Sequence, residues 1–207
     1  MDYRIAFRKT KGKKLYVDPV GEEGFYLYPG EIRKAGLKEG MVISGDDLSA
    51  IHKEYAVPRA RRHALGLLAK KDMTEKELVE KLEKSLNDSR SIAAAMAFVT
   101  EHGYIDDRRY VEDYIYSHKG KKSFLQMKEI LLRKGVSGDT IRRVMEEEGQ
   151  QSPEDIRPLV EKYARKFPDL DYTSTQKILM HFGRKGYSIH TVREILRDLE
   201  TSGDEQE

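Results

Sequence analysis

The residues of this chain whose chemistry is easiest to read are basic side chains gathered in short clusters. Arginine and lysine make charge-assisted hydrogen bonds to phosphates and carboxylates, so the clusters indicate contacts with nucleic acid or with an acidic protein surface. The net charge is only +2, so the interpretation depends on the clusters and not on the total. The candidate binding residues are Arg61, Arg62, Lys119, Lys121, Lys122, Arg133, Lys134, Arg142, Arg143, Arg184, Lys185 and Arg193.

Two of these clusters belong to a segment that the chain contains twice. Residues 133–145 begin Arg-Lys-Gly, and residues 184–196 repeat Arg, Lys, Gly, Ser, Thr and Arg in the same order. In each copy the glycine can end one helix in the left-handed conformation, and the serine can cap the next. The pattern therefore predicts helix, tight turn, helix, a geometry that can present a reading helix to nucleic acid.

A simpler interpretation of the basic pairs stays open. Charged residues make up 36% of the sequence, so Arg-Lys pairs are expected throughout, with acidic neighbours to neutralise them. Tyrosines offer a similar choice, because Tyr104, Tyr110, Tyr114 and Tyr187 could stack on bases. Their helical spacing favours positions in a core or an interface.

The sequence lacks the motifs of common catalytic and cofactor sites. There is no phosphate-binding glycine loop, zinc-binding helix or nucleophile elbow, and the absence of cysteine removes thiol chemistry and disulfides. The six histidines are scattered, and we expect surface or partly packed positions for them. Asp106, Asp107 and Asp113 could hold a divalent ion, but Asp106 is better explained as a helix cap. We predict no enzyme, cofactor or metal.

From residue 58 onward the pattern is helical. Thr74, Ser123 and Ser174 each precede apolar residues four and eight positions later, which predicts three capped central helices at similar intervals. Flanking helices are predicted at 60–71, 107–118 and 158–166 before the central helices, and at 91–101, 139–148 and 190–200 after them. Three-helix repeats are thus predicted over 58–104, 105–149 and 150–203, with a frayed acidic tail at 204–207.

Two details of the third repeat follow from residue preferences. Pro158 is placed in a first helical turn, so residues 152–156 are interpreted as a lead-in. Gly203 is interpreted as the stop of the last helix, as Gly103 and Gly149 are for the earlier third helices.

Residues 1–57 have a different composition, in which short runs of aromatic and β-branched residues alternate with residues that favour turns. They predict strands near 3–7, 14–17, 24–28 and 41–43, with helices at about 31–37 and 46–55. The basic run at 8–14 is predicted to be an exposed hairpin that either blunts an edge strand or binds phosphate. Because so small a sheet is marginal alone, we expect it to dock on the helices that follow. The fold class is therefore mainly α: an elongated array of three helix-turn-helix-like repeats after a small β-containing domain.

Hydropathy gives the expected location. No stretch approaches the roughly 20 apolar residues needed to span a bilayer, and the N-terminus lacks the apolar region of a secretory signal. We expect a cytoplasmic monomer that does not engage a membrane.

Several of these segments together resemble one family. Residues 103–110 (GYIDDRRY), Lys119-Gly120, residues 129–136 (EILLRKGV) and Ile141 are similar to the signature of the RecX family of bacterial recombination regulators. Residues 74–82 look like that family's first repeat, and the likeness covers about 58–200. The sequence departs from the expected pattern at Phe124 and Gln126, where many members are expected to carry a basic residue.

The resemblance implies a non-enzymatic regulator of homologous recombination and DNA repair. Its implied partner is a RecA-type recombinase filament on single-stranded DNA, along whose helical groove it would lie, inhibiting ATP hydrolysis and strand exchange. Direct contact with single-stranded or double-stranded DNA is a second implied interaction. The alternative from the residues alone is a plain nucleic-acid-binding protein that uses the repeats as helix-turn-helix-like modules.

Overall fold

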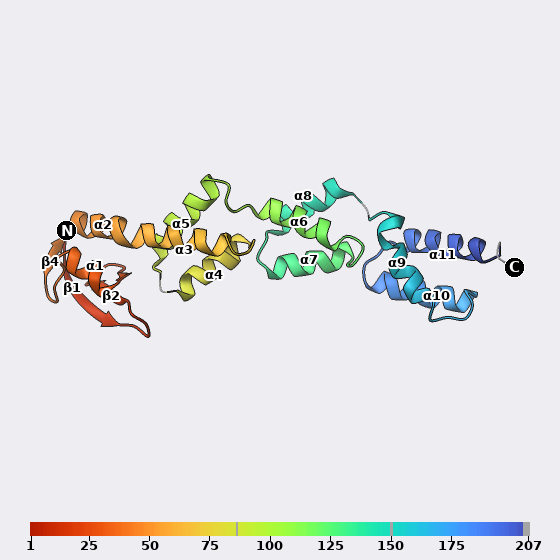
Figure 1. Ribbon diagram of the computed structural model, residues 1–207, viewed down its shortest axis with the longest axis horizontal. Coiled ribbons are helices and arrows are strands. Elements are labelled where there is room, and N and C mark those ends of the chain that lie inside the picture. The colour runs from red at the N-terminus through yellow and green to blue at the C-terminus, as the bar shows by residue number, and fades with distance from the viewer. Residues whose placement is uncertain (86, 150, 205–207) are drawn as a thin grey trace. The chain divides into compact units, whose positions relative to one another are not determined.

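The computed structural model describes residues 1–85, 87–149 and 151–204. The chain is mainly helical with a small N-terminal antiparallel sheet (Figure 1), as the sequence predicts at this level. It divides into two compact units, residues 1–106 and 107–207, which we describe one at a time. In the described residues no helix is long and apolar enough to cross a membrane.

The first unit begins with a four-stranded sheet. Strands β1 (Asp2–Lys9), β2 (Leu15–Pro19), β3 (Phe25–Leu27) and β4 (Val42–Ser44) are antiparallel neighbours in the order β3-β2-β1-β4. The predicted basic hairpin is present, because Lys9 pairs with Leu15. Strands β1 and β2 occupy the middle of the sheet, but β4 pairs with β1 at Asp2–Arg4, away from the hairpin, so the blunting of an edge by these lysines stays a prediction.

The helices of this region pack their apolar residues onto one face of the sheet. Helix α1 (Pro29–Lys34) begins with Pro29 in its first turn and buries Ile32. Buried Ile5, Val17, Phe25 and Leu27 from the strands form a common core with Leu37 and Leu48. Predicted boundaries shift here by two or three residues, because proline fits the first turn of a helix.

A single run of helix leads out of the sheet region. Helix α2 (Gly45–Ile51) is capped by Ser44, as predicted, and passes without a break into a π-helical turn η1 (His52–Ala56) and then into α3 (Val57–Leu68). At the end of η1 the backbone N–H of Val57 donates to the carbonyl of His52. The predicted boundary at residue 57 therefore falls inside continuous helix.

Helices α3, α4 (Glu75–Lys84) and α5 (Ser89–Glu101) enclose one small core. Thr74 and Glu77 form the predicted capping box of α4, and α5 is capped by Asp88. Buried side chains from all three helices meet in the cluster Ala60, Ala64, Met73, Leu78, Leu82, Ile92, Ala95, Val99 and Ile105. Apolar residues that recur every three or four positions give each helix one apolar face, and these faces pack together.

The sheet docks on these helices, as the sequence predicts. Arg59 of α3 donates to Glu31 and to the backbone carbonyl of Tyr26, and the Nζ of Lys14 donates to the carbonyl of Ser85 at 2.8 Å. Burial, followed by the nearby Arg59 guanidinium, lowers the pKa of Lys14 to about 8. Lys14 is thus part of the junction, unlike the exposed Lys11 and Lys13 beside it.

The second unit starts with helices α6 (Asp107–His118), α7 (Phe124–Arg133) and α8 (Gly138–Glu148). Ser123 and Gln126 form the predicted capping box of α7, and Ser137 caps α8. Gly135, at φ +90°, makes the turn between them in the predicted left-handed conformation. The core of this group is Val111, Ile115, Met127, Leu131, Val136, Ile141 and Val144.

Helices α9 (Pro153–Ala164), α10 (Tyr172–Arg184) and α11 (Ile189–Asp204) follow and correct three predictions. Ser152 and Asp155 form a capping box that starts α9 at Pro153, so Pro158 lies inside the helix. Asp171, not Ser174, caps α10 by accepting from the Ser174 N–H. Gly203 does not stop α11, which runs to Asp204. The rest of the predicted tail, 205–207, lies outside the described residues.

The core of this last group explains why the helices still pair as expected. Buried Ile156 and Val160 of α9 meet Ile178 and Phe182 of α10 and, on α11, the buried apolar residues Val192, Ile195 and Leu196. The apolar spacing fixed these contacts, whereas the caps depended on which short polar side chain stood first.

The two helix groups of the second unit meet at close backbone contacts. The Ser123 hydroxyl donates to the carbonyl of Lys185, and the side-chain amide of Gln151 donates to the carbonyl of Lys122 at 2.8 Å. At Gly186, where φ is +82°, a Cβ would lie only 2.5 Å from the Cβ of Leu125. The repeated glycine is therefore needed here both for its turn and for its lack of a side chain.

Candidate functional site

Most of the predicted basic residues are exposed, some within helices and some at helix ends or in connecting loops. Arg133, Arg143, Arg184 and Arg193 all have exposed side chains, and the Nε of Arg184 donates to the carbonyl of Met180 at 3.3 Å. Arg133 ends α7 and Arg184 ends α10. The two copies of the repeated segment thus carry an arginine at the same helical position.

Two predicted residues are paired with carboxylates. Arg142 forms ion pairs with Asp139 at 3.0 Å and Glu146 at 4.0 Å, and Lys119 lies 3.7 Å from Asp155 and 4.0 Å from Glu148. The simpler interpretation of neutralised basic pairs therefore applies to these two positions. They are weaker candidates for a partner contact than their unneutralised neighbours.

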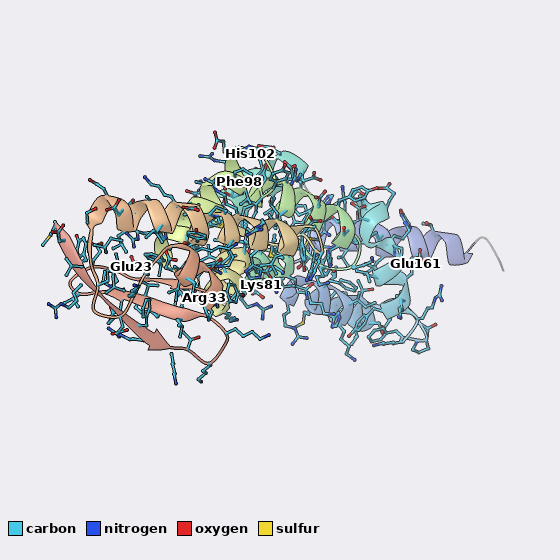
Figure 2. All side chains as sticks on the ribbon, turned by 60° about the vertical axis from the view of Figure 1, so that its left-hand side comes forward. Glu23, Arg33, Lys81, Phe98, His102 and Glu161 are labelled. Carbon is cyan, nitrogen blue, oxygen red and sulfur yellow. The ribbon has the colours of Figure 1, made fainter. Side chains whose placement is uncertain are left out.

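Two other predicted residues lie against aromatic rings. The guanidinium of Arg61 is 5.0 Å from the centre of the Phe98 ring, and the Nζ of Lys134 is 5.4 Å from the centre of the Tyr110 ring. Figure 2 labels Phe98 of α5 and His102, the residue that follows this helix. Their ring centres are 4.3 Å apart. Both cations keep their charge while the ring covers one side of the side chain.

The four predicted tyrosines divide into buried or partly buried residues and one exposed residue. Tyr110 and Tyr114 are partly buried against the core of α6–α8, and Tyr187 is buried in the core of α9–α11. Tyr104 is the exception, with 51% of its surface exposed. The core interpretation holds for three of the four.

The structure brings two of the predicted basic residues into one cavity. Lys121, from the loop between α6 and α7, and Lys185, at the end of α10, line a cavity of about 200 Å³ together with Lys162 and Lys166 of α9. All four lysine side chains are exposed. The residues lining this cavity, which we call the lysine pocket, also include Gln126, Leu159, Tyr163, His181, Phe182 and Tyr187. Among the described residues, no carboxylate lines it.

Aromatic side chains form the inner wall of the lysine pocket. The rings of Tyr163 and His181 stack at 3.9 Å between centres and 13° between planes, and Phe182 meets Tyr163 edge-on at 5.8 Å. Burial, followed by the nearby positive charges of Lys185, Lys166 and Arg184, lowers the pKa of His181. At neutral pH this imidazole is therefore an uncharged flat ring.

Lys162 and Lys166 were not predicted as binding residues. Both lie in the helix predicted over 158–166, but outside the repeated Arg-Lys segments and the other basic clusters from which the candidates were chosen. Two lysines four residues apart on one helix, with Tyr163 between them, would have marked a basic and aromatic face. The pairing of this face with Lys121 could not be read from the sequence, because it depends on the contact between two helix groups.

A second cavity lies on the other side of Tyr187. Its volume is about 310 Å³, and its lining includes Phe124, Gln151, Ile156, Gly186, Ser188 and Thr191. These residues carry no charge. From the residues that the structure describes, the cavity has hydroxyl and amide groups but no counterion for an anionic ligand.

The first unit contains a buried polar cluster that the sequence did not indicate. The Nε2 of His52 is 2.9 Å from Asp88 Oδ1 and 3.0 Å from the Ser91 hydroxyl, which also donates to Asp88 Oδ2 at 2.8 Å. Histidine was expected at or near the surface, but His52 is only 6% exposed. Serine and carboxylate meet the same ring nitrogen, so the cluster lacks the relay of a Ser-His-Asp triad.

Burial alone would raise the pKa of Asp88, but the hydrogen bonds from His52 and Ser91 outweigh it and lower the pKa. The carboxylate caps α5 and joins it to η1. This cluster holds the sheet region to the first helices. In the described residues there is no group of three or more histidine, aspartate or glutamate side chains placed to hold a metal ion.

The whole chain has relatives of similar length. It is 26% identical over 202 residues to the regulatory protein RecX of Clostridium acetobutylicum, covering 95% of this chain and 94% of that one. It is 25% identical over 199 residues to the regulatory protein RecX of Caldanaerobacter subterraneus, covering 93% and 96%. The predicted resemblance to the RecX family is confirmed.

Solved RecX structures share the fold. A crystal structure of regulatory protein RecX matches 95% of this chain and 99% of its own, with a TM-score of 0.59 and 20% identity. The crystal structure of RecX from Lactobacillus salivarius matches 70% and 97%, with a TM-score of 0.63 and 21% identity. No family model matches the chain.

Proposed function

We propose that this protein is a non-enzymatic regulator that binds a RecA-type recombinase filament and inhibits its ATP hydrolysis and strand exchange. The observation that carries the proposal is the similarity to RecX regulatory proteins along almost the full length of both chains. A match that extends from the sheet through all the helices supports a shared role better than a match confined to one motif.

We further propose that the helices form tandem repeats, with bounds near 58–104, 105–149 and 150–203. Each of the groups α3–α5, α6–α8 and α9–α11 has its own buried cluster, which supports this division. Arg133 and Arg184 end the central helices of the second and third groups. Basic residues at equivalent places would let one chain bind successive protomers of a filament through several weak contacts.

The proposal is tested by measuring DNA-stimulated ATP hydrolysis by a RecA-type recombinase while this protein is added, from far below to equal molar amounts. We expect hydrolysis to fall at substoichiometric ratios with free DNA in excess, because one regulator on a filament affects many protomers. Loss only when the protein coats the DNA would favour the alternative, a nucleic-acid-binding protein with helix-turn-helix-like modules.

A charge-reversed variant identifies the binding face. Replacing Arg133, Lys134, Arg184 and Lys185 together by glutamate should abolish inhibition and leave the helical circular dichroism unchanged. The matched control replaces Lys38, Lys53, Lys70 and Lys71, which are exposed lysines of the first unit, and changes the net charge equally. Equal inhibition by both variants would remove the four repeat residues from the binding face.

A further inference from the structure

The lysine pocket combines two kinds of surface: four lysine side chains and a group of aromatic and aliphatic side chains line the same cavity. Lys121, Lys162, Lys166 and Lys185 converge on it from the α6–α7 loop, from α9 and from the end of α10. Within the described part of the chain, none of these four ammonium groups forms an ion pair with a carboxylate. Four like charges around one cavity repel each other, and a polyanion relieves that repulsion.

The contacts of these lysines leave the charges available. The Nζ of Lys121 donates to the carbonyl of Ser117 at 3.3 Å, and the Nζ of Lys166 lies 4.6 Å from the centre of the Tyr163 ring. A carbonyl and a ring face orient an ammonium group without neutralising it. Lys162 and Lys166 are one helical turn apart, so both can reach one anionic group.

The inner wall suits a flat ring better than a hydrated ion. The partly exposed rings of Tyr163 and His181 contribute aromatic surface and Leu159 contributes aliphatic surface, while Phe182 and Tyr187 line the cavity from buried positions. A small inorganic anion would leave this surface uncovered. A ligand with a planar heterocycle could cover it, while the amide of Gln126 is available to hydrogen-bond at the ring's edge.

We propose that the lysine pocket binds a nucleotide, with its phosphates among the four lysines and its base against the aromatic wall. The cavity of about 200 Å³ is of the order needed for a base and its nearest phosphate, with the sugar at the opening. The nucleotide can be free or can be part of a single strand. This inference goes beyond the proposed function and does not depend on it, since it needs no recombinase.

The architecture around the cavity is fixed by close contacts. The Ser123 hydroxyl holds the carbonyl of Lys185, and a Cβ at Gly120 would come 2.6 Å from the carbonyl oxygen of Asp155. These contacts bind the α6–α7 loop to α9 and to the end of α10. The pocket is therefore largely formed before a ligand arrives, which lowers the entropic cost of binding.

The test uses the full-length protein alone and nuclear magnetic resonance of its backbone amides. The probes are ATP, inorganic tripolyphosphate, adenosine, a short oligodeoxyadenylate and a polyglutamate peptide. We expect ATP to shift the amides near Lys121, Lys162 and Lys185, and to bind more tightly than tripolyphosphate or adenosine. Tripolyphosphate binding as tightly as ATP would overturn the role of the aromatic wall, and tighter binding of polyglutamate would assign the pocket to an acidic protein.

The oligodeoxyadenylate separates the two sources of the nucleotide. If it competes with ATP for the same amides and binds more tightly, the ligand is a single strand. If ATP binds more tightly, the ligand is a free nucleotide. No shift at the pocket with any probe would overturn the proposal.

Two matched variants locate the binding. Replacing Lys162 and Lys166 by glutamine should weaken ATP binding by about tenfold for each lysine, the loss expected for one charge-assisted hydrogen bond. The control replaces Lys128 and Lys177, exposed lysines of α7 and α10 that do not line the pocket. Equal affinity in the two variants would place the nucleotide elsewhere.

The pKa of His181 gives a second measurement on the unaltered protein. Its titratable and charged surroundings are Tyr163 and Lys166 of α9, together with Arg184 and Lys185 of its own helix. A bound polyphosphate would offset these positive charges, so the His181 pKa should rise when ATP is present. An unchanged His181 pKa at saturating ATP would contradict binding in this pocket.

Discussion

Two junctions in this protein join one group of elements to the next, and they are built with opposite chemistry. In the first unit, His52, Asp88 and Ser91 are buried and hydrogen-bonded to each other between η1 and α5. In the second unit, the junction between α6–α8 and α9–α11 keeps an open cavity lined by lysines. The polar side chains of the first junction hydrogen-bond to one another. The lysines of the second junction line a cavity.

This difference separates structural polar residues from candidate binding residues. A buried polar group without its partner is costly, so the three residues of the first junction must satisfy one another. Exposed ammonium groups remain hydrated and cost little when they have no partner. Charge alone therefore does not identify a site, and the lysine pocket is a candidate because four lysines line one cavity together with aromatic side chains.

The largest effect is expected from Asp88→Ala, which breaks the first junction. The change removes the cap of α5 and leaves His52 and Ser91 buried without their acceptor. We expect a loss of about 3 kcal/mol in the free energy of unfolding, measured by urea denaturation. The control is Ser137→Ala, an exposed cap of α8, with an expected loss of about 1 kcal/mol. Equal losses would mean that the buried cluster adds nothing beyond capping.

The second junction is tested by Gly186→Ala. At φ +82° the new Cβ would be strained and would also collide with Leu125, so we expect a loss of about 2–3 kcal/mol in unfolding free energy. Gly103→Ala is the matched control, because φ is +65° there and its turn has the same backbone hydrogen bonds as that of Gly186, but nothing lies within 4 Å of the new Cβ. Its expected loss is about 1 kcal/mol. Similar values for both would show that contact with Leu125 is unimportant.

Acid should weaken the first junction through Asp88. Because the folded protein lowers the pKa of this carboxyl group, its ionised form stabilises the fold above the unfolded value of about 3.9. That stability is lost as the pH falls through the folded pKa. The difference in unfolding free energy between the unaltered protein and Asp88→Asn should therefore shrink below about pH 4. A constant difference down to pH 2 would contradict this.

The smallest effect is expected from an exposed ion pair. Arg142→Gln removes the contacts with Asp139 and Glu146, which are surrounded by water. The expected change in unfolding free energy is below about 0.5 kcal/mol, measured beside Asp88→Ala under the same conditions. A larger loss would mean that surface charges contribute to these junctions more than their exposure suggests.

The sequence predicted elements better than junctions, for physical reasons that particular residues illustrate. Thr74 and Ser123 cap helices as predicted because a capping box is a local pattern. Pro158 misled the prediction of α9 because Pro153 supplied a better start. Lys121 and Lys185 were predicted as candidates, but Lys162 and Lys166 were not, since only tertiary packing brings the four together. His52 was missed because burial of a histidine has no sequence pattern.

The π-helical turn at His52–Ala56 sets the phase between two hydrophobic stripes on one continuous helix. One residue of an α-helix corresponds to about 100° of rotation, and a π turn accommodates one residue more than an α turn would. The apolar face of α2 packs toward the sheet, and the apolar face of α3 packs toward α5. The extra residue of the π turn sets the angle between these two faces around the helix axis. A deletion of one residue within 52–56 would keep both apolar faces but rotate one by about 100° relative to the other. The fold therefore depends on the length of this turn as well as on its side chains.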